Sequence, residues 1–275
     1  MASITDIVTE GLKYPFNDTK KLLTLGVAFL LVSLLSLFSQ YLTFQSITAG
    51  FSGSGFTNVS STNMILVAII SIIMFIILFF VVGYSYKVIK YGIDNKTELP
   101  EFNDPLKMFL NGLKAVAVGF VYSIPPLLLL VLGFLLGVNR NVGSGINSVG
   151  IILIVIAALF FIFTYFFSVM AISHMVAGDK LSNAFKFKEI TAIISKLGWF
   201  KYIGIVLFAL IVFVVITIFF QIIFGMVASL FGYLLGSSLV ALIISALLIS
   251  LLVQPYCSIF LSRVFGSLYR VADEA

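Results

Sequence analysis

Residues 64–86 read Met64-Ile-Leu-Val-Ala-Ile-Ile-Ser-Ile-Ile-Met-Phe-Ile-Ile-Leu-Phe-Phe-Val-Val-Gly-Tyr-Ser-Tyr86, without one charged side chain. A helix rises about 1.5 Å per residue, so about 20 apolar residues cross the roughly 30 Å hydrocarbon layer of a membrane. A strand of a membrane barrel would alternate polar and apolar residues, which this segment does not do. The segment therefore predicts a transmembrane helix, in which every backbone group pairs internally.

Five further segments are long and apolar enough to do the same. Of all residues in the chain, 61% are apolar and 10% are charged, whereas about 25% are charged in a soluble domain. We therefore expect an all-α integral membrane protein with six transmembrane helices in a single membrane domain, residues 1–275. The other five segments are Leu22–Phe38, Ala115–Leu136, Val149–Met175, Tyr202–Met226 and Leu239–Leu261.

Positive charge lies on one side of these predicted helices. Every Lys and Arg except Arg140 falls before the first segment, between the second and third, between the fourth and fifth, or at the end of the sixth and beyond. Loops rich in Lys and Arg remain in the cytoplasm. We expect a multi-pass protein of the cell membrane with both termini in the cytoplasm.

A short motif recurs on the predicted cytoplasmic side. Phe16-Asn17-Asp18 is repeated as Phe102-Asn103-Asp104, and Phe187-Lys188-Glu189 keeps the aromatic–polar–acidic order at a nearly equal interval. Each copy precedes an odd-numbered segment. The pattern predicts three tandem helical hairpins, with repeats 12–97, 98–183 and 184–270.

The acidic residue of the motif has a structural interpretation. Asp18 and Asp104 stand where an N-cap belongs, and Pro105 suits the first position of a helix. Apolar residues recur at helical spacing nearby, which predicts short amphipathic helices along the cytoplasmic interface before the first, third and fifth segments. A docking surface for a partner is the alternative. The apolar residues are Ile4, Ile7 and Val8; Leu106, Phe109, Leu110 and Leu113; and Ile190, Ile193, Ile194 and Leu197.

Three sequence elements resemble a known family. They are Tyr14-Pro-Phe-Asn-Asp-x-x-Lys21, Leu99-Pro-Glu-Phe-Asn-Asp104 and Gly112-Leu-Lys114. They are similar to the largely archaeal membrane-protein family catalogued as domain of unknown function 4013. The resemblance implies a multi-pass membrane protein and brings no catalytic residue, substrate or cofactor. The third copy of the motif departs from it, because Lys188-Glu189 replaces Asn-Asp.

Side chains that could bind a metal or act in catalysis are scarce. His174 and Cys257 are the single histidine and the single cysteine, so we expect no metal site, no disulfide within the chain and no cofactor. His174 is interpreted as an interfacial side chain, with ligand binding as the alternative, and Cys257 as a small apolar residue. No phosphate-binding loop and no nucleophile–base pair can be assembled. We expect no enzyme and no nucleic-acid partner.

Two predicted helices contain helix breakers. Pro125-Pro126 lies in the third segment and Gln254-Pro255 in the sixth. A kink repaired by neighbouring groups is the favoured interpretation, and a broken helix that lines a binding site is the alternative.

Two functional classes remain for such a chain. The favoured class is a non-catalytic scaffold or assembly protein, which binds a membrane-protein partner or its own copies within the bilayer, because the spans lack charge and a motif recurs on the cytoplasmic side. The second is a transporter or channel for an apolar or lipid-like molecule, since its pathway needs no ionisable side chain. A polar cavity between the third and sixth segments would favour transport, and a filled interior would favour the scaffold.

The topology can be tested with single cysteines. In a Cys257→Ala background, we expect Asn58→Cys to react with a membrane-impermeant maleimide on intact cells and Lys96→Cys to stay unlabelled. Labelling of position 96 alone would invert the orientation.

Overall fold

The computed structural model describes residues 4–49, 61–138 and 146–275. The described residues form helices and no strand, and six of these helices are long and apolar enough to cross a membrane. The predicted all-α class and the six spans are therefore confirmed. Asn58 and Arg140, on which the outer side of the topology depends, lie outside the described residues.

The observed helices are longer than the predicted segments. α3, for example, continues past Tyr86 to Ile93 and includes Lys87 and Lys90, because a long basic side chain can extend to water while its backbone stays helical. The six spans are α2 (Thr19–Ala49), α3 (Ser61–Ile93), α4 (Pro105–Gly137), α5 (Ser148–Gly178), α7 (Trp199–Leu234) and a composite of α8 (Ser238–Leu248), a π-helical turn (Ile249–Val253) and α9 (Gln254–Asp273).

Short helices precede two of the three odd-numbered spans. α1 (Ile4–Lys13) leads through the 3-10 helix Tyr14–Asn17 into α2, and α6 (Phe187–Leu197) follows the 3-10 helix Leu181–Phe185. Both form as the apolar spacing predicts, while their place on the membrane interface stays a prediction.

The expected separate helix before the third span is wrong, because α4 runs unbroken from Pro105. A break separates α6 from α7 at Gly198, whose φ of 93° is left-handed. In α4 no such break occurs, and Gly112 lies inside the helix against α3.

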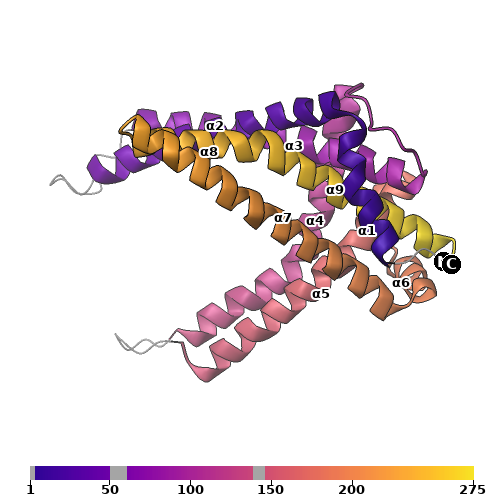
Figure 1. Cartoon of the computed structure of the whole chain (residues 1–275). Helices are drawn as coiled ribbons and strands as arrows, with labels where there is room; N and C mark the ends of the chain where they lie inside the picture. The colour runs from indigo at the N-terminus through magenta and orange to yellow at the C-terminus, as the bar shows by residue number, and fades with distance from the viewer. Residues whose placement is uncertain (1–3, 50–60, 139–145) are drawn as a thin grey trace.

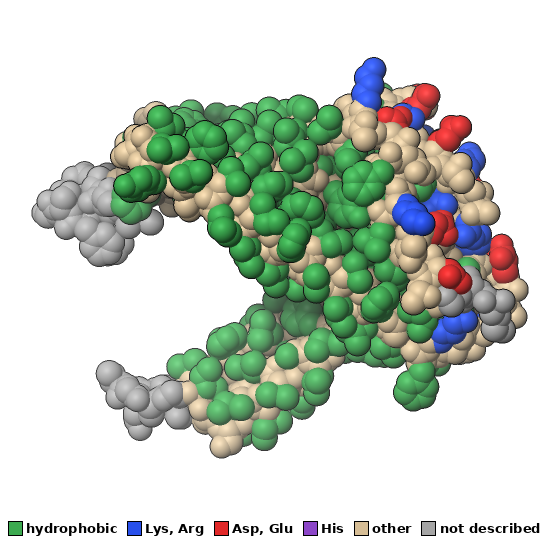
Figure 2. Space-filling model, in the orientation of Figure 1, with side chains coloured by type: hydrophobic (Ala, Val, Ile, Leu, Met, Phe, Trp, Pro, Cys, Tyr) green, Lys and Arg blue, Asp and Glu red, His purple; other side chains and the backbone are tan. Residues whose placement is uncertain are grey.

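The six spans form two arms that diverge from a common base (Figure 1). The larger arm contains α2, α3, α7 and α8, and the smaller arm is the α4–α5 hairpin. The charged side chains in view gather at the base, where both termini lie, and the arms present hydrophobic side chains (Figure 2). We call this base the charged end. Exposed apolar arms are stable when lipid, and not water, surrounds them.

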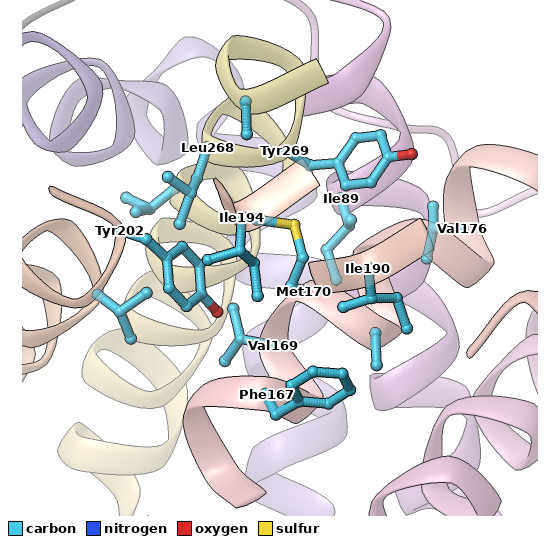
Figure 3. Close-up of a cluster of buried hydrophobic side chains, with 14 of the residues drawn as sticks. Ile89, Phe167, Val169, Met170, Val176, Ile190, Ile194, Tyr202, Leu268 and Tyr269 are labelled. Atoms are coloured by element: carbon cyan, nitrogen blue, oxygen red, sulfur yellow. The ribbon is translucent and has the colours of Figure 1, made fainter. Parts of the chain in front are cut away.

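A cluster of buried side chains fills the charged end (Figure 3). It joins both arms, because its members come from α1, α3, α4, α5, α6, α7 and α9. The hydroxyl of Tyr202 in α7 donates to the carbonyl oxygen of Phe166 in α5 at 2.5 Å. The labelled members are Ile89, Phe167, Val169, Met170, Val176, Ile190, Ile194, Tyr202, Leu268 and Tyr269.

Glycines let α3 approach two neighbours closely. A Cβ atom on Gly112 would overlap the carbonyl oxygen of Phe79, and one on Gly83 would overlap the carbonyl oxygen of Met108. The contact between α3 and α4 is therefore reciprocal and made by backbone atoms, as small residues permit in membranes. Gly266 of α9 meets α3 in the same way.

A buried ion pair ties the ends of the chain together. The Arg263 side chain is 2% exposed, and its Nη2 lies 2.5 Å from Oε1 of Glu10. Its Nη1 donates to the carbonyl oxygens of Tyr91 at 3.1 Å and Lys96 at 2.6 Å. The guanidinium lies 4.3 Å from the centre of the Tyr14 ring. Burial raises the pKa of Tyr14 to about 12, although the nearby Arg263 opposes the shift.

The close contact between α3 and α4 predicts different outcomes for two glycines of α4. Gly112→Ala should prevent the native packing, because the added methyl group overlaps backbone that cannot move aside. Gly119→Ala should be tolerated, since a Cβ atom there meets nothing within 4 Å. Thermal unfolding in detergent should show a large loss for the first variant and none for the second. Equal behaviour of the two variants would contradict this packing.

The ion pair gives a second prediction. Glu10→Ala leaves Arg263 buried and unpaired, which costs about 3–5 kcal/mol for a fully buried pair and less here, because Glu10 is 34% exposed. We expect a clearly lower unfolding temperature for Glu10→Ala and none of this loss for the exposed control Glu274→Ala. The double variant Glu10→Met with Arg263→Met should recover part of the loss. A double variant less stable than Glu10→Ala would contradict the role of the unpaired charge.

Candidate ligand-binding site

The first motif copy holds the loop between α3 and α4. Asn17 donates its side-chain amide to the carbonyl oxygen of Thr97 at 2.8 Å. Asp18 accepts a hydrogen bond from the backbone N–H of Lys21 at 3.0 Å, so it caps α2 as predicted. This bond also lowers the pKa of Asp18. Phe16 packs against Tyr256, with 5.3 Å between ring centres.

The second copy contacts α3. Phe102 stacks on Tyr84 at 4.3 Å, and the Asn103 side-chain oxygen accepts from Lys87 Nζ at 2.6 Å. Asp104 occupies the N-cap position of α4, but its side chain caps nothing. That part of the prediction is wrong. Its φ of 52° before Pro105 is left-handed, whereas a capping side chain reaches the helix from an extended backbone.

The third copy joins three elements of the charged end. Glu189 Oε2 lies 3.1 Å from His174 Nε2, and Glu189 Oε1 lies 3.1 Å from Lys186 Nζ. The hydrogen bonds from Lys186 and His174 lower the pKa of Glu189. His174 Nδ1 is 2.8 Å from the Tyr269 hydroxyl. No local pattern predicts this link, because α5, α6 and α9 contribute one partner each.

Corresponding contacts recur around the bundle. Each motif phenylalanine packs on an aromatic side chain near the charged end of an even-numbered span. The pairs are Phe16 with Tyr256, Phe102 with Tyr84, and Phe187 with Phe167. Gly26 also meets the carbonyl oxygen of Leu251, as Gly112 meets that of Phe79. These contacts favour the repeats 12–97, 98–183 and 184–270, which remain a prediction.

The predicted breakers lie in different surroundings. α4 passes through Pro125 and Pro126 without interruption, and Pro125 borders an apolar pocket of about 330 Å³ between α4, α5 and α6. Pro255 has no N–H to donate to Leu251, and a π-helical turn stands just before it. Gln254 is exposed. The sixth span is thus irregular at Pro255, as the kink interpretation expects.

A cavity of about 280 Å³ lies between the two arms, and we call it the junction cavity. α3 and α9 form one wall, and α4 and α5 form the other, so it lies between the third and sixth spans. Its volume is close to the lower end of small-molecule sites, about 300–1,000 Å³. The lining residues are Val82, Ser85, Tyr86, Ile89, Ala115, Val116, Tyr165, Ser168, Val169, Ile172, Ser262 and Phe265.

Hydroxyl groups are the polar feature of this apolar cavity. Ser262 is 6% exposed and has no hydrogen-bond partner among the described residues. Ser85 lies 3.0 Å from Ser258, oxygen to oxygen, and Ser168 donates to the carbonyl oxygen of Tyr165 at 2.8 Å. No fully buried side-chain oxygen or nitrogen of the described residues lacks a partner, so the unpaired Ser262 oxygen is accessible from the cavity. A ligand with a polar atom beside Ser262 would give this hydroxyl a hydrogen-bond partner.

The cavity is suited to binding an uncharged group. No Asp, Glu, Lys, Arg or His lines it, and the described residues contain no cluster of three or more His, Cys, Asp or Glu that could hold a metal ion. Cys257 is buried in α9, 3.8 Å from the Thr217 hydroxyl. The arrangement can surround a hydrocarbon chain and hydrogen-bond to an ester, ether or hydroxyl group on it.

Sequence reasoning missed the junction cavity. Its lining residues come from four helices whose mutual packing no local pattern reveals. The signal that was present is the set of serines near the charged ends of otherwise apolar spans, at Ser85, Ser168, Ser258 and Ser262.

Comparison with known proteins gives one result. Residues 66–225 match the family model described as "Protein of unknown function (DUF4013)", while no curated protein and no solved structure matches the chain significantly. The matched region includes α4 and α5 and nearly all of α3, and therefore most of the walls of the junction cavity. The chain belongs to the DUF4013 family, as the resemblance of its motifs indicates.

Proposed function

We propose that this protein is a non-catalytic membrane protein that binds a lipid-like molecule in the junction cavity and transports it. The observation that carries the proposal is the cavity itself, in whose apolar wall the hydroxyl of Ser262 is accessible and has no hydrogen-bond partner among the described residues. A pure scaffold would have a filled interior between the third and sixth spans, and the junction cavity leaves that interior open. The cavity is mainly apolar, and not polar as expected for a transport pathway, so the proposed ligand is lipid-like.

The composition of the walls defines the ligand. Ions need charged or many polar groups to replace their hydration, and no charged side chain lines the cavity. Apolar side chains such as Val116, Ile172 and Phe265 surround the few hydroxyls. Hydrocarbon chains are already present in the bilayer around both arms, so a lipid-like ligand needs no aqueous route.

The location of the protein follows from its charges. The charged end carries the Lys and Arg residues in view (Figure 2) and both termini (Figure 1), so we place it in the cytoplasm and the protein in the cell membrane. Its partners in this proposal are the bilayer and its lipids, and no nucleic acid is involved.

A scaffold is the second candidate, and the divergence of the arms favours it. Figure 2 shows hydrophobic walls on both sides of the space between them. An apolar helix of another membrane protein, or a second copy of this chain, could pack there. Native mass spectrometry of protein purified gently from its own membrane separates the candidates: a retained lipid supports transport, and a stoichiometric protein partner supports the scaffold.

The proposed site predicts where a lipid chain crosslinks. Vesicles would contain the protein and a diacylglycerol with a diazirine at the end of one acyl chain. We expect photo-crosslinks on Val116, Ile172 or Phe265, and at least a five-fold lower yield for Ser262→Leu, because the larger side chain fills the cavity.

Ser123→Leu is the matched control, because Ser123 lies in α4 outside the cavity lining, and its crosslinks should equal those of the wild type. Both variants must give the same elution volume and unfolding temperature as the wild type. Crosslinks confined to lipid-facing residues of the arms would refute the junction cavity as a lipid site.

A further inference from the structure

A second pocket adjoins the junction cavity at Tyr86, toward the charged end. It measures about 240 Å³ and is formed by the next turns of the same three helices, α3, α4 and α5, together with the loop before α4. We call it the charged pocket. Its lining residues are Tyr86, Lys87, Lys90, Tyr91, Glu101, Asn103, Asp104, Lys107, Asn111, Val176 and Asp179.

Tyr86 is the residue that the two pockets share. Its side chain is 5% exposed, and its hydroxyl donates to Oδ1 of Asp179 at 2.8 Å. Asp179 ends α5 and lies 3.9 Å from Lys114 Nζ. One aromatic side chain, held by one hydrogen bond, therefore stands between an apolar cavity within the bilayer and a polar pocket at its edge.

The charged pocket contains charges of both signs that no ion pair neutralises. Lys87 donates to the carbonyl oxygens of Glu101 and Asn103, at 3.2 and 2.7 Å, and to no carboxylate. Lys107, Glu101 and Asp104 have no ion-pair partner among the described residues. The ammonium group of Lys107 and the carboxylates of Glu101 and Asp104 are thus available to a ligand. Lys87 adds positive charge beside them, while its three N–H groups are hydrogen-bonded to Glu101 and Asn103.

We propose that the charged pocket is the head-group subsite for the lipid-like ligand, and that this ligand is an amphiphile with a zwitterionic head that combines a phosphate and an ammonium group. The proposal rests on the proposed function, because the junction cavity holds the chain. The phosphate lies toward Lys87 and Lys107, and the ammonium lies toward Glu101 and Asp104.

Charge balance selects this class of head group. A purely anionic head would face the two free carboxylates, and a head without charge would leave all four groups unused. Opposite charges a few ångströms apart attract more strongly at the edge of a bilayer than in bulk water. The pocket also gives the second motif copy a role, since Asn103 orients Lys87 and Asp104 lines the pocket.

Three photo-reactive lipids test the head group. Vesicles would contain the full-length protein with a trace of phosphatidylethanolamine, phosphatidylglycerol or diacylglycerol, each with the same diazirine-bearing chain. We expect the crosslink yield on residues of the junction cavity to be at least five-fold higher for phosphatidylethanolamine than for the other two probes.

Charge variants test the subsite itself. Glu101→Gln with Asp104→Asn removes both free carboxylates, and Asn accepts the left-handed backbone of Asp104. We expect this variant to lose the preference for phosphatidylethanolamine and to crosslink phosphatidylglycerol at least as well. Lys188→Gln, an exposed charge change outside the pocket, should keep the wild-type order of the probes.

The outcomes separate the two proposals. If no probe crosslinks in the junction cavity, the proposed function fails. If all three probes crosslink there equally, or phosphatidylglycerol is preferred by the wild type, the cavity binds lipid but the zwitterionic subsite is refuted. An unchanged preference in the double carboxylate variant, with its fold verified by unfolding temperature, would also refute it.

Discussion

The ion pair between Arg263 and Glu10 is the interaction on which the arrangement of the helices depends. Membrane helices gain no hydrophobic energy from contact with one another, because lipid is as apolar as their own side chains. Two diverging arms must therefore be held at their base by other forces. The buried cluster at the charged end joins the two arms, and Arg263 holds this end together, since from α9 it reaches α1 through Glu10 and the loop between α3 and α4 through the carbonyl oxygens of Tyr91 and Lys96. Burying a guanidinium is costly, and four simultaneous partners, including the Tyr14 ring, offset that cost.

From this base, α3 sets the positions of the other helices by backbone contact. Gly83 and Gly112 bring α3 and α4 together, and Gly266 brings α9 onto α3. Such contacts define distance more strictly than interdigitated side chains do, because backbone cannot adopt another rotamer. The walls of the junction cavity are parts of these same helices. The cavity therefore persists because α4 and α9 are each held against α3, and are not free to collapse onto one another.

The sequence predicts the features of this protein that depend on local pattern. Hydropathy is sufficient for six spans, and apolar spacing for α1 and α6. Local pattern fails where tertiary contacts determine the backbone. α4 continues through Gly112 because α3 lies against it, and Asp104 takes a left-handed conformation before Pro105. Arg263 is a basic residue near the end of the chain in the sequence, and a buried one in the fold. The site is less predictable still, since four helices contribute to the junction cavity.

The three motif copies show how one local pattern takes on different roles. Asn17 binds the loop between α3 and α4, Asn103 binds Lys87 of α3, and Glu189 binds His174 of α5. In each case a polar side chain before an odd-numbered span joins that span to a neighbouring element. The second copy alone has the ends of α3, α4 and α5 around it, and these ends form the charged pocket. The second motif copy thus becomes part of a candidate binding site because of its position in the fold, while its residues are those of the first copy.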